Sequence, residues 1–251
     1  MKKPFILLGG FSRTTSSSLH QCFTSSNVLT TGDFKEHCYL NSIEDYQNNS
    51  SHLDSYSYLY RTSRIHYLFP TWNTLSHLKR DFFTTQTPSI NQYLHYYLEV
   101  SKNYPTIPIV GDFTTTYSNL NQHLLKDLRK VFEPYFDVKV LILLRDPVER
   151  LFSEFRYSQT NINQLLNTYQ GLYQCTYDKY SNIFPTFCFD TIQLINHYHK
   201  KNELSEFLGV DIPDFDPVKI NSTKDLEISN YHYKVAKRIL KPDIDFYQSH
   251  L

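Results

Sequence analysis

The amino-acid sequence predicts an α/β protein in three layers (αβα), with a central, mainly parallel sheet. Short apolar runs of strand length alternate along the chain with segments in which apolar residues recur every three or four positions. This alternation is typical of parallel strands whose connecting helices cover both faces of the sheet. No internal repeat and no linker interrupts the 251 residues, so we expect residues 1–251 to form a single domain.

Four apolar runs are expected to form strands of that sheet. The clearest is Val138 to Leu144, in which nearly every residue is aliphatic, as in a strand buried on both faces. The opening run, Phe5 to Leu8, resembles the apolar part of a signal peptide, but it is short and ends in Gly9-Gly10. We therefore interpret it as a buried first strand. The other two runs are 108–112 and 187–189.

Helices are expected between and after these strands. One occupies 16–23, and another ends near Gly209. A third begins at Asp146-Pro147, because aspartate suits the N-cap, proline suits the first helical position, and Glu149 stands at the reciprocal capping place. Two more have apolar residues at helical spacing: Ile90, Leu94, Tyr97 and Leu98, and then Leu120, Leu124, Leu125, Leu128 and Phe132.

The charge balance argues against two classes of protein. Lys plus Arg and Asp plus Glu number 25 each, so the formal net charge is zero. Proteins that bind nucleic acids or membrane surfaces usually carry a lopsided charge, so we expect neither partner. Any chemistry on anions must therefore come from local clusters. The polar segment 46–60, rich in Asn, Ser and Tyr, is expected to lie on the surface.

The cysteines and the hydropathy pattern indicate a soluble, cytoplasmic protein. No apolar run approaches the roughly 20 residues that a membrane span needs. The cysteines have no CxxC or zinc-type spacing, so we expect reduced thiols and no metal site. They are Cys22, Cys38, Cys175 and Cys188.

The first candidate anion site is the loop from Gly9 to Leu19, between the first predicted strand and the first helix. Backbone N–H groups at a helix start lack partners within the helix, and the helix dipole favours an anion there. Arg13 adds positive charge. Five consecutive hydroxyl side chains add donors: Thr14, Thr15, Ser16, Ser17 and Ser18. A Ser/Thr run at this place is also a common helix cap, and that alternative stays open.

The second candidate anion site is the segment from Leu144 to Ser153. Arg145 directly follows the most apolar strand, and Ser153 lies two turns along the next helix, on the face shared with Asp146 and Arg150. An arginine fork and a hydroxyl can hold a phosphate between them. The alternative is a network of arginine and acidic side chains that braces a capped helix.

Both candidate sites lie at the carboxyl ends of predicted parallel strands, which is where α/β sheets bind ligands. We therefore expect the two segments to meet in space. Arg13 and Arg145 would then bind opposite ends of one ligand that carries two separated anionic groups.

The first loop resembles the 5′-phosphosulfate loop of the sulfotransferases that use 3′-phosphoadenosine 5′-phosphosulfate (PAPS), usually Pro-Arg/Lys-x-Gly-Thr-Thr-x-Leu. Arg13 stands at the basic position, Ser16 and Ser17 at the paired hydroxyls, and Leu19 at the helix leucine. The sequence departs from the motif at Phe11-Ser12, and Thr15 replaces the glycine of the loop.

The second segment is similar to the 3′-phosphate motif of the same family, Arg-Asp-Pro-x-x-Arg-x-x-Ser. Residues 145–153 match every specified position. The resemblance implies that Arg145 and Ser153 bind the 3′-phosphate.

Three further segments resemble the family more weakly and occur in the same order. Lys35-Glu36 is similar to the Lys-Glu pair of heparan-sulfate-type enzymes, in which the glutamate is the catalytic base. The segment that begins at Gly111 is similar to a strand end in those enzymes. Asp112 occupies its acidic position, and Phe113 occupies a position that is often lysine. The resemblance makes Lys35 and Asp112 candidates for orienting neighbouring groups or contacting the acceptor. Lys224, in a closing segment, is a candidate nucleotide contact.

The resemblance implies a P-loop-like sulfotransferase fold and an enzyme that moves a sulfuryl group from PAPS to an acceptor hydroxyl or amine, with release of the bisphosphate nucleotide PAP. Glu36 would take the acceptor's proton and Arg13 would stabilise charge on the departing nucleotide, with no metal ion. A carbohydrate acceptor is favoured; tyrosine, lipid and small-metabolite acceptors stay open, as does the oligomeric state.

Two other functions stay open at this stage. A kinase-like P-loop phosphotransferase has the same general architecture, but the Gly-Lys-Ser/Thr ending of its phosphate loop is missing here. A non-catalytic nucleotide-binding module on the sulfotransferase scaffold is the other alternative, because the glycine and the lysine noted above are replaced.

Overall fold

The computed structural model describes residues 2–32, 35–48, 87–158, 161–169, 172–190, 198–214 and 228–251. Its five strands form one sheet in the order β2-β3-β1-β4-β5, and the neighbouring strands are parallel. In chain order the strands are β1 Lys3–Leu8, β2 Leu29–Thr30, β3 Ile109–Asp112, β4 Phe136–Leu144 and β5 Thr186–Asp190. The predicted α/β class with a parallel central sheet is confirmed.

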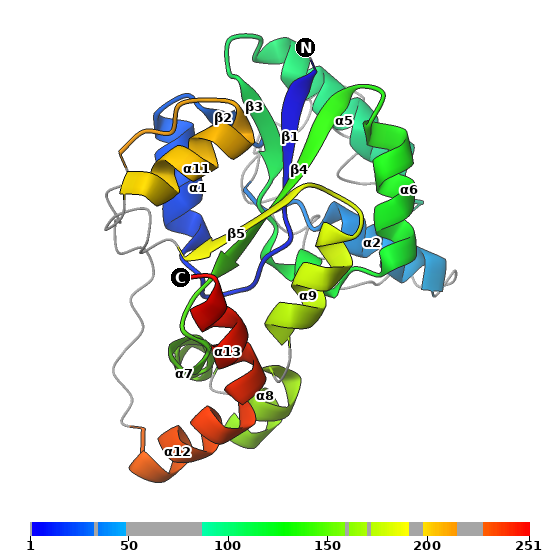
Figure 1. Cartoon of the computed structure of the whole chain (residues 1–251). Helices are drawn as coiled ribbons and strands as arrows, with labels where there is room; N and C mark the ends of the chain where they lie inside the picture. Colours follow the sequence, from blue (N-terminus) through cyan, green and yellow to red (C-terminus); the bar gives the residue numbers. More distant parts are fainter. Residues whose placement is uncertain are drawn as a thin grey trace, which may run out of the picture.

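The strand order reverses at β1, which lies in the middle of the sheet (Figure 1). From β1 the chain continues into β2 and β3 on one side, and only later into β4 and β5 on the other side. In open α/β sheets, such a reversal opens a crevice at the carboxyl ends of the central strands. The segments that follow β1 and β4 leave the sheet at this place.

Alternate residues of the central strands contribute to opposite faces of the sheet. Phe5 and Leu7 of β1 join one hydrophobic cluster, and Ile6 and Leu8 join another. All four are at most 1 % exposed. Burial on both faces explains why residues 5–8 of β1 and 140–144 of β4 are continuous apolar runs in the sequence.

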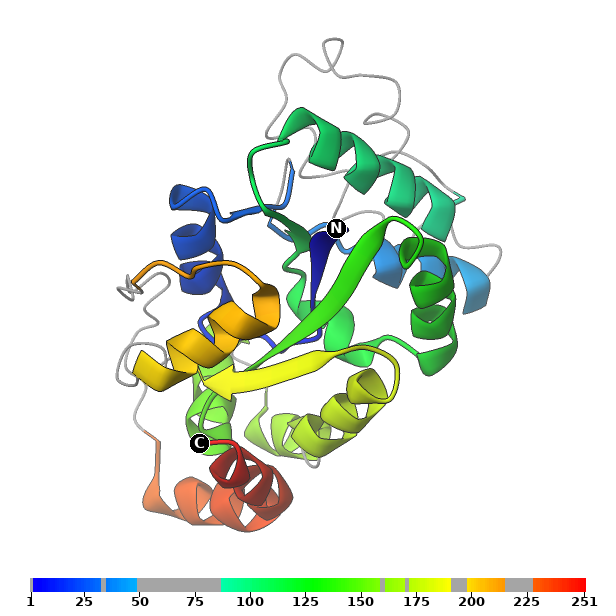
Figure 2. The ribbon, with the colours of Figure 1, turned by 45° about the horizontal axis from the view of Figure 1, so that its top comes forward.

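Helices cover both faces of the sheet (Figures 1 and 2). Helices α5, α6 and α9 contribute to the cluster of Phe5, whereas α1 and α11 contribute to the cluster of Ile6. A third apolar cluster joins α7, α8 and α12. The helices are α1 Ser16–Ser25, α2 Tyr39–Asn48, α5 Ile90–Asn103, the 3-10 helix η2 Thr115–Asn119, α6 Gln122–Phe132, α7 Pro147–Ser158, α8 Ile162–Tyr169, α9 Leu172–Ser181, α11 Tyr198–Leu208, α12 Asn230–Ile239 and α13 Lys241–Ser249.

The helix starts follow from local capping. Oδ1 of Asp146 accepts the N–H groups of Val148 and Glu149, each at 2.9 Å, so Asp146 caps α7 as predicted. The helix expected from Leu120 begins two residues later, because the side chain of Asn121 accepts the N–H of Leu124 and forms the N-cap.

One further prediction concerns the surface of the chain. The expected surface segment 46–60 starts in the last, exposed turn of α2, and its residues from 49 onward lie outside the described residues.

Among the helices of the described ranges, none combines the length and the apolar character that a membrane crossing requires.

Candidate functional site

The loop after β1 contacts both Ser153 of α7 and Arg145 at the end of β4. Nε of Arg13 donates a hydrogen bond to Oγ of Ser153 at 3.0 Å, across 140 positions of the sequence. Nη1 of Arg145 donates to the backbone carbonyl oxygen of Arg13 at 3.2 Å. The structure therefore brings together the basic residue of the first candidate site and the two predicted phosphate-binding residues of the second.

Arg150 holds the same loop in place from within the protein. Its side chain is 4 % exposed, and Nε donates to the carbonyl oxygen of Ser12 at 3.3 Å. Its guanidinium group lies over the ring of Phe11, 4.5 Å from the ring centre, and 5.2 Å from the ring centre of Tyr173. Arg150 is the second arginine of the 145–153 motif, and its role in holding the loop follows from the structure alone.

Tyr173 of α9 was not predicted as part of the site. Its hydroxyl donates to the carbonyl oxygen of Arg145 at 2.8 Å, which fixes the backbone at the end of β4. Burial raises the pKa of Tyr173 to about 12, so the phenol stays a donor at neutral pH. No sequence motif marks this tyrosine, because the contact depends on how α9 packs.

Two residues of the first loop have left-handed backbones. Arg13 has φ 64°, and Thr15 has φ 62° and ψ 18°. A residue with a side chain adopts this conformation at a cost of about 1–2 kcal/mol. Thr15 occupies the position of the glycine in the 5′-phosphosulfate loop motif. The loop therefore keeps the left-handed backbone that suits glycine, although the residue is a threonine. Strain of this kind is common at functional sites.

The Ser/Thr run does not form a side-chain cap on α1. Thr15 is the N-cap residue, but its side chain makes no capping bond and donates instead to the carbonyl oxygen of Thr14. The Thr14 hydroxyl, fully buried, donates to the carbonyl oxygen of Phe11 at 2.8 Å. Ser16 and Ser18 are buried and Ser17 is half-buried. The start of α1 therefore keeps the anion-binding character of a helix N-terminus without a side-chain cap.

Lys35 and Glu36 lie beside the start of α1. Nζ of Lys35 donates to Oγ of Ser16 at 3.1 Å and lies 2.7 Å from Oε1 of Glu36. The two side chains are 17 % and 22 % exposed. The predicted Lys35-Glu36 pair thus places a cation and a carboxylate next to the loop from Gly9 to Leu19.

Lys35 and His20 of α1 both line a pocket of about 260 Å³. Nε2 of His20 lies 3.0 Å from Oγ1 of Thr31. Burial, followed by the charges of Lys35 and His37, lowers the pKa of His20 to about 4. His20 is therefore a neutral imidazole at neutral pH.

Two predicted residues, Asp112 and Lys224, remain to be placed. Asp112 is fully buried, and its carboxylate accepts hydrogen bonds from the N–H and hydroxyl of Thr114 and from the hydroxyls of Tyr93 and Tyr117. This position suits the expected orienting role better than contact with an acceptor. Lys224 lies outside the described residues.

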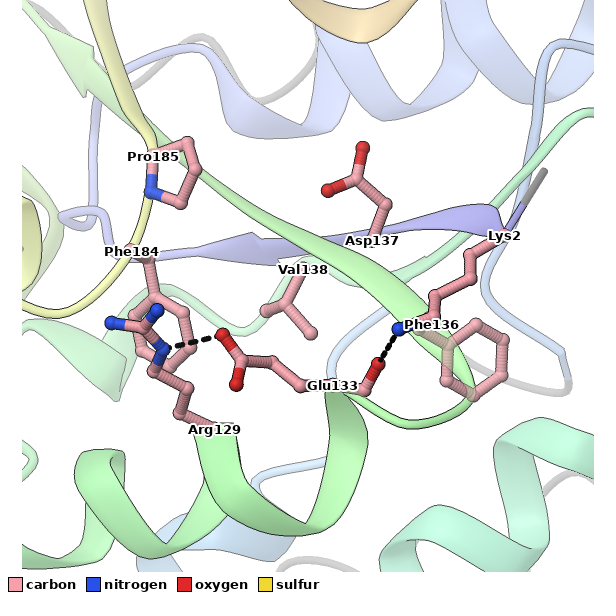
Figure 3. A pocket seen from close by; sticks show the side chains of 8 residues that line it. All are labelled: Lys2, Arg129, Glu133, Phe136, Asp137, Val138, Phe184 and Pro185. Carbon is pink, nitrogen blue, oxygen red and sulfur yellow. Dashed lines mark hydrogen bonds and ion pairs between the residues drawn. The ribbon is translucent and has the colours of Figure 1, made fainter.

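A larger pocket, of about 460 Å³, lies at the opposite edge of the sheet, where β4 and β5 begin (Figure 3). It is lined by none of the predicted site residues. Its charged groups already have partners: Arg129 donates to the carboxylate of Glu133, Lys2 donates to the carbonyl oxygen of Glu133, and Asp137 forms an ion pair with Lys139. Within the described ranges, no three His, Cys, Asp or Glu side chains form a group that could hold a metal ion.

Comparison with known proteins places the chain among sulfotransferase folds. It is similar in structure to the sulfotransferase domain from the olefin synthase of Synechococcus PCC 7002, with a TM-score of 0.53 and 17 % identity over 98 % of this chain and 87 % of that one. The sulfotransferase domain from the curacin biosynthetic pathway gives a TM-score of 0.50 and 16 % identity over 83 % and 74 % of the two chains. No protein-family model and no curated protein matches the sequence.

Proposed function

We propose that this chain is a sulfotransferase that moves a sulfuryl group from PAPS to an acceptor hydroxyl or amine. The observation that carries the proposal is the contact of Arg13 with Ser153 and Arg145 at the carboxyl ends of β1 and β4. Two anion-binding segments that contact each other can bind the two ends of a single nucleotide that carries an anionic group at each end. The sulfotransferase fold of the chain supports the same function.

The donor would be held at both ends by this chain's own groups. Arg145 and Ser153 would bind the 3′-phosphate; the Ser153 hydroxyl accepts from Arg13 and can still donate its own proton to a phosphate oxygen. The start of α1, with Ser16 and Ser17, would bind the 5′-phosphosulfate. Sulfuryl transfer, like phosphoryl transfer, leaves little covalent work to the protein, so positioning and charge stabilisation supply most of the rate.

In the transfer step, the acceptor oxygen or nitrogen forms a bond to sulfur while the bond between sulfur and the bridging oxygen of PAPS breaks. The electron pair of that bond stays on the departing nucleotide, where Arg13 and Lys35 would stabilise the negative charge. Glu36 would take the acceptor's proton, a role typically worth about 10²–10⁴ in rate.

The similarity of Lys35-Glu36 to heparan-sulfate-type enzymes favours a carbohydrate acceptor. The pocket that Lys35 lines suits a polyhydroxylated molecule, because His20, Thr24, Thr30 and Thr31 line the same pocket with polar groups that carry no charge at neutral pH.

One observation favours a second candidate, a nucleotide-binding module without catalysis. Phe113 stands where the resembling enzymes often have lysine, and it is fully buried in the apolar cluster of Ile6. This position therefore supplies no cation to a reacting sulfuryl group. Lys35 supplies one from the neighbouring segment, which is why we favour the enzyme.

Two measurements test the proposal. Thermal shifts with PAP, 5′-AMP and ATP–magnesium should show the largest stabilisation with PAP; stabilisation by ATP–magnesium alone would indicate a kinase-like protein. Turnover of PAPS against a panel of carbohydrate, phenol and amine acceptors then separates the enzyme from the module. PAP binding with no sulfated product from any acceptor class would support the module.

A further inference from the structure

Thr114 connects the end of β3 to the segment that carries Lys35 and Glu36. Its Oγ1 accepts the N–H of His37 at 2.9 Å and the N–H of Cys38 at 3.1 Å, and it donates to Oδ1 of Asp112 at 2.6 Å. Thr114 is fully buried. A single hydroxyl group therefore joins two segments that lie 77 positions apart in the sequence.

The Asp112 end of this connection is fixed by the core. Oδ1 of Asp112 also accepts the N–H of Thr114 at 3.0 Å, and Oδ2 accepts the hydroxyls of Tyr93 at 2.9 Å and Tyr117 at 2.7 Å. Burial, and then the charge of Asp112, raise the pKa of both tyrosines well above the ordinary value, so both stay donors. A buried carboxylate with four donors has one well-defined position.

The 35–38 segment is bound to the end of β3 on both sides of Glu36. Before Glu36, the carbonyl oxygen of Lys35 accepts the N–H of Phe113 at 3.0 Å. After Glu36, the N–H groups of His37 and Cys38 donate to Thr114. Cys38 has φ 54°, a left-handed backbone that residues with side chains seldom adopt, so this turn needs support from its surroundings. Thr114 gives that support.

We propose that Thr114 is a positioning residue, whose hydroxyl sets where Glu36 and Lys35 lie relative to Ser16 at the start of α1. The inference rests on the proposed function, in which Glu36 takes the acceptor's proton. Thr114 acts through the backbone of the segment and not by contact with the reacting atoms. Displacement of a reacting group by about 1 Å can lower the rate on the order of 10²-fold.

A pair of substitutions tests this role. Thr114→Val keeps the shape of the side chain and removes the hydroxyl, whereas Thr114→Ser keeps the hydroxyl. We expect Thr114→Val to lower kcat about 10- to 100-fold while the Kd for PAP stays within about twofold, and we expect Thr114→Ser to retain most of kcat. Wild-type kcat in Thr114→Val would overturn the inference.

A nearby threonine provides the matched control. Thr116 lies two residues further along, in η2, and its hydroxyl donates to Oδ1 of Asn41 at 2.7 Å in an exposed position. Thr116→Val makes the same chemical change without touching the 35–38 segment, so kcat should be unchanged. An equal loss of kcat in Thr116→Val would overturn the specific role of Thr114.

Amide hydrogen exchange in the wild-type chain tests the same connection without any variant and without turnover. The amides of His37 and Cys38 should exchange at least about 100-fold more slowly than unprotected amides, because both donate to a buried oxygen. Unprotected exchange at both amides would overturn the inference, even if Thr114→Val fails to fold. If the wild-type chain does not bind PAP, the proposed function fails, whereas the exchange result still decides whether Thr114 holds the segment.

Discussion

Arg145 donates a hydrogen bond from Nη1 to the backbone carbonyl oxygen of Arg13 at 3.2 Å. The arginine at the tip of β4 thereby contacts the left-handed turn that follows β1. Nε of Arg13 in turn donates a hydrogen bond to Oγ of Ser153 in α7, at 3.0 Å. The two candidate anion sites therefore form one structural unit, and a change in Arg145 is expected to affect both.

The first prediction concerns nucleotide affinity. Arg145→Ala should weaken PAP binding about 10- to 100-fold, because charge-assisted hydrogen bonds contribute about 1.5–3 kcal/mol and about 1.4 kcal/mol corresponds to a factor of ten. Calorimetric titration with PAP measures this change. Arg129→Ala, at the opposite edge of the sheet, is the control and should leave the affinity unchanged. Equal affinities in wild type and Arg145→Ala would remove Arg145 from the site.

The second prediction separates turnover from binding. Glu36→Gln should keep the Kd for PAP within about twofold and lower kcat by about 10²–10⁴, because the amide cannot take a proton. The side chain keeps its size, so the backbone hydrogen bonds of the 35–38 segment should persist. Full turnover in Glu36→Gln would require a different base.

Four of the five strands and the two main motifs could be predicted from the sequence because their signals are local, whereas β2, of only two residues, Leu29–Thr30, is too short to give such a signal. Val138 to Leu144 is buried on both faces of the sheet, so almost every residue is apolar. The ends of parallel strands meet at one edge, so the motif positions alone predicted that Arg13 and Arg145 would meet. The atoms that join them depend on the left-handed turn at Arg13 and Thr15, which no residue type in the loop indicates.

The missed elements have tertiary causes. Helix α9 buries Tyr173, Thr176 and Tyr180, which do not form an apolar pattern in the sequence. Helix α2 has its buried residues in its first half and a polar second half, so its sequence reads as a surface segment. The hydroxyl of Thr114 joins segments 77 positions apart, and only the folded structure reveals that contact.

The third prediction concerns the backbone strain at Thr15. Thr15→Gly should raise the free energy of unfolding by about 0.5–1 kcal/mol, because relief of the left-handed penalty exceeds the extra chain entropy of glycine in the unfolded state. Urea unfolding measures the difference. Thr15→Ala keeps a Cβ atom and should give no such gain. If Thr15→Ala stabilises the chain as much as Thr15→Gly, the cause is the lost hydroxyl and not the backbone.

The fourth prediction concerns the dependence of stability on pH. His20 has a folded-state pKa of about 4 against an ordinary value of 6.5, so the unfolded chain binds this proton more readily than the folded chain does. The resulting stabilisation is complete above pH 6.5 and is lost as the pH falls to about 4, with a total of up to about 3 kcal/mol. His20→Gln, which does not titrate, should therefore show a shallower loss of unfolding free energy than the wild-type chain over this range. Urea titrations at several pH values between 7.5 and 4 make the comparison, and parallel curves for the two proteins would mean that the imidazole is solvated.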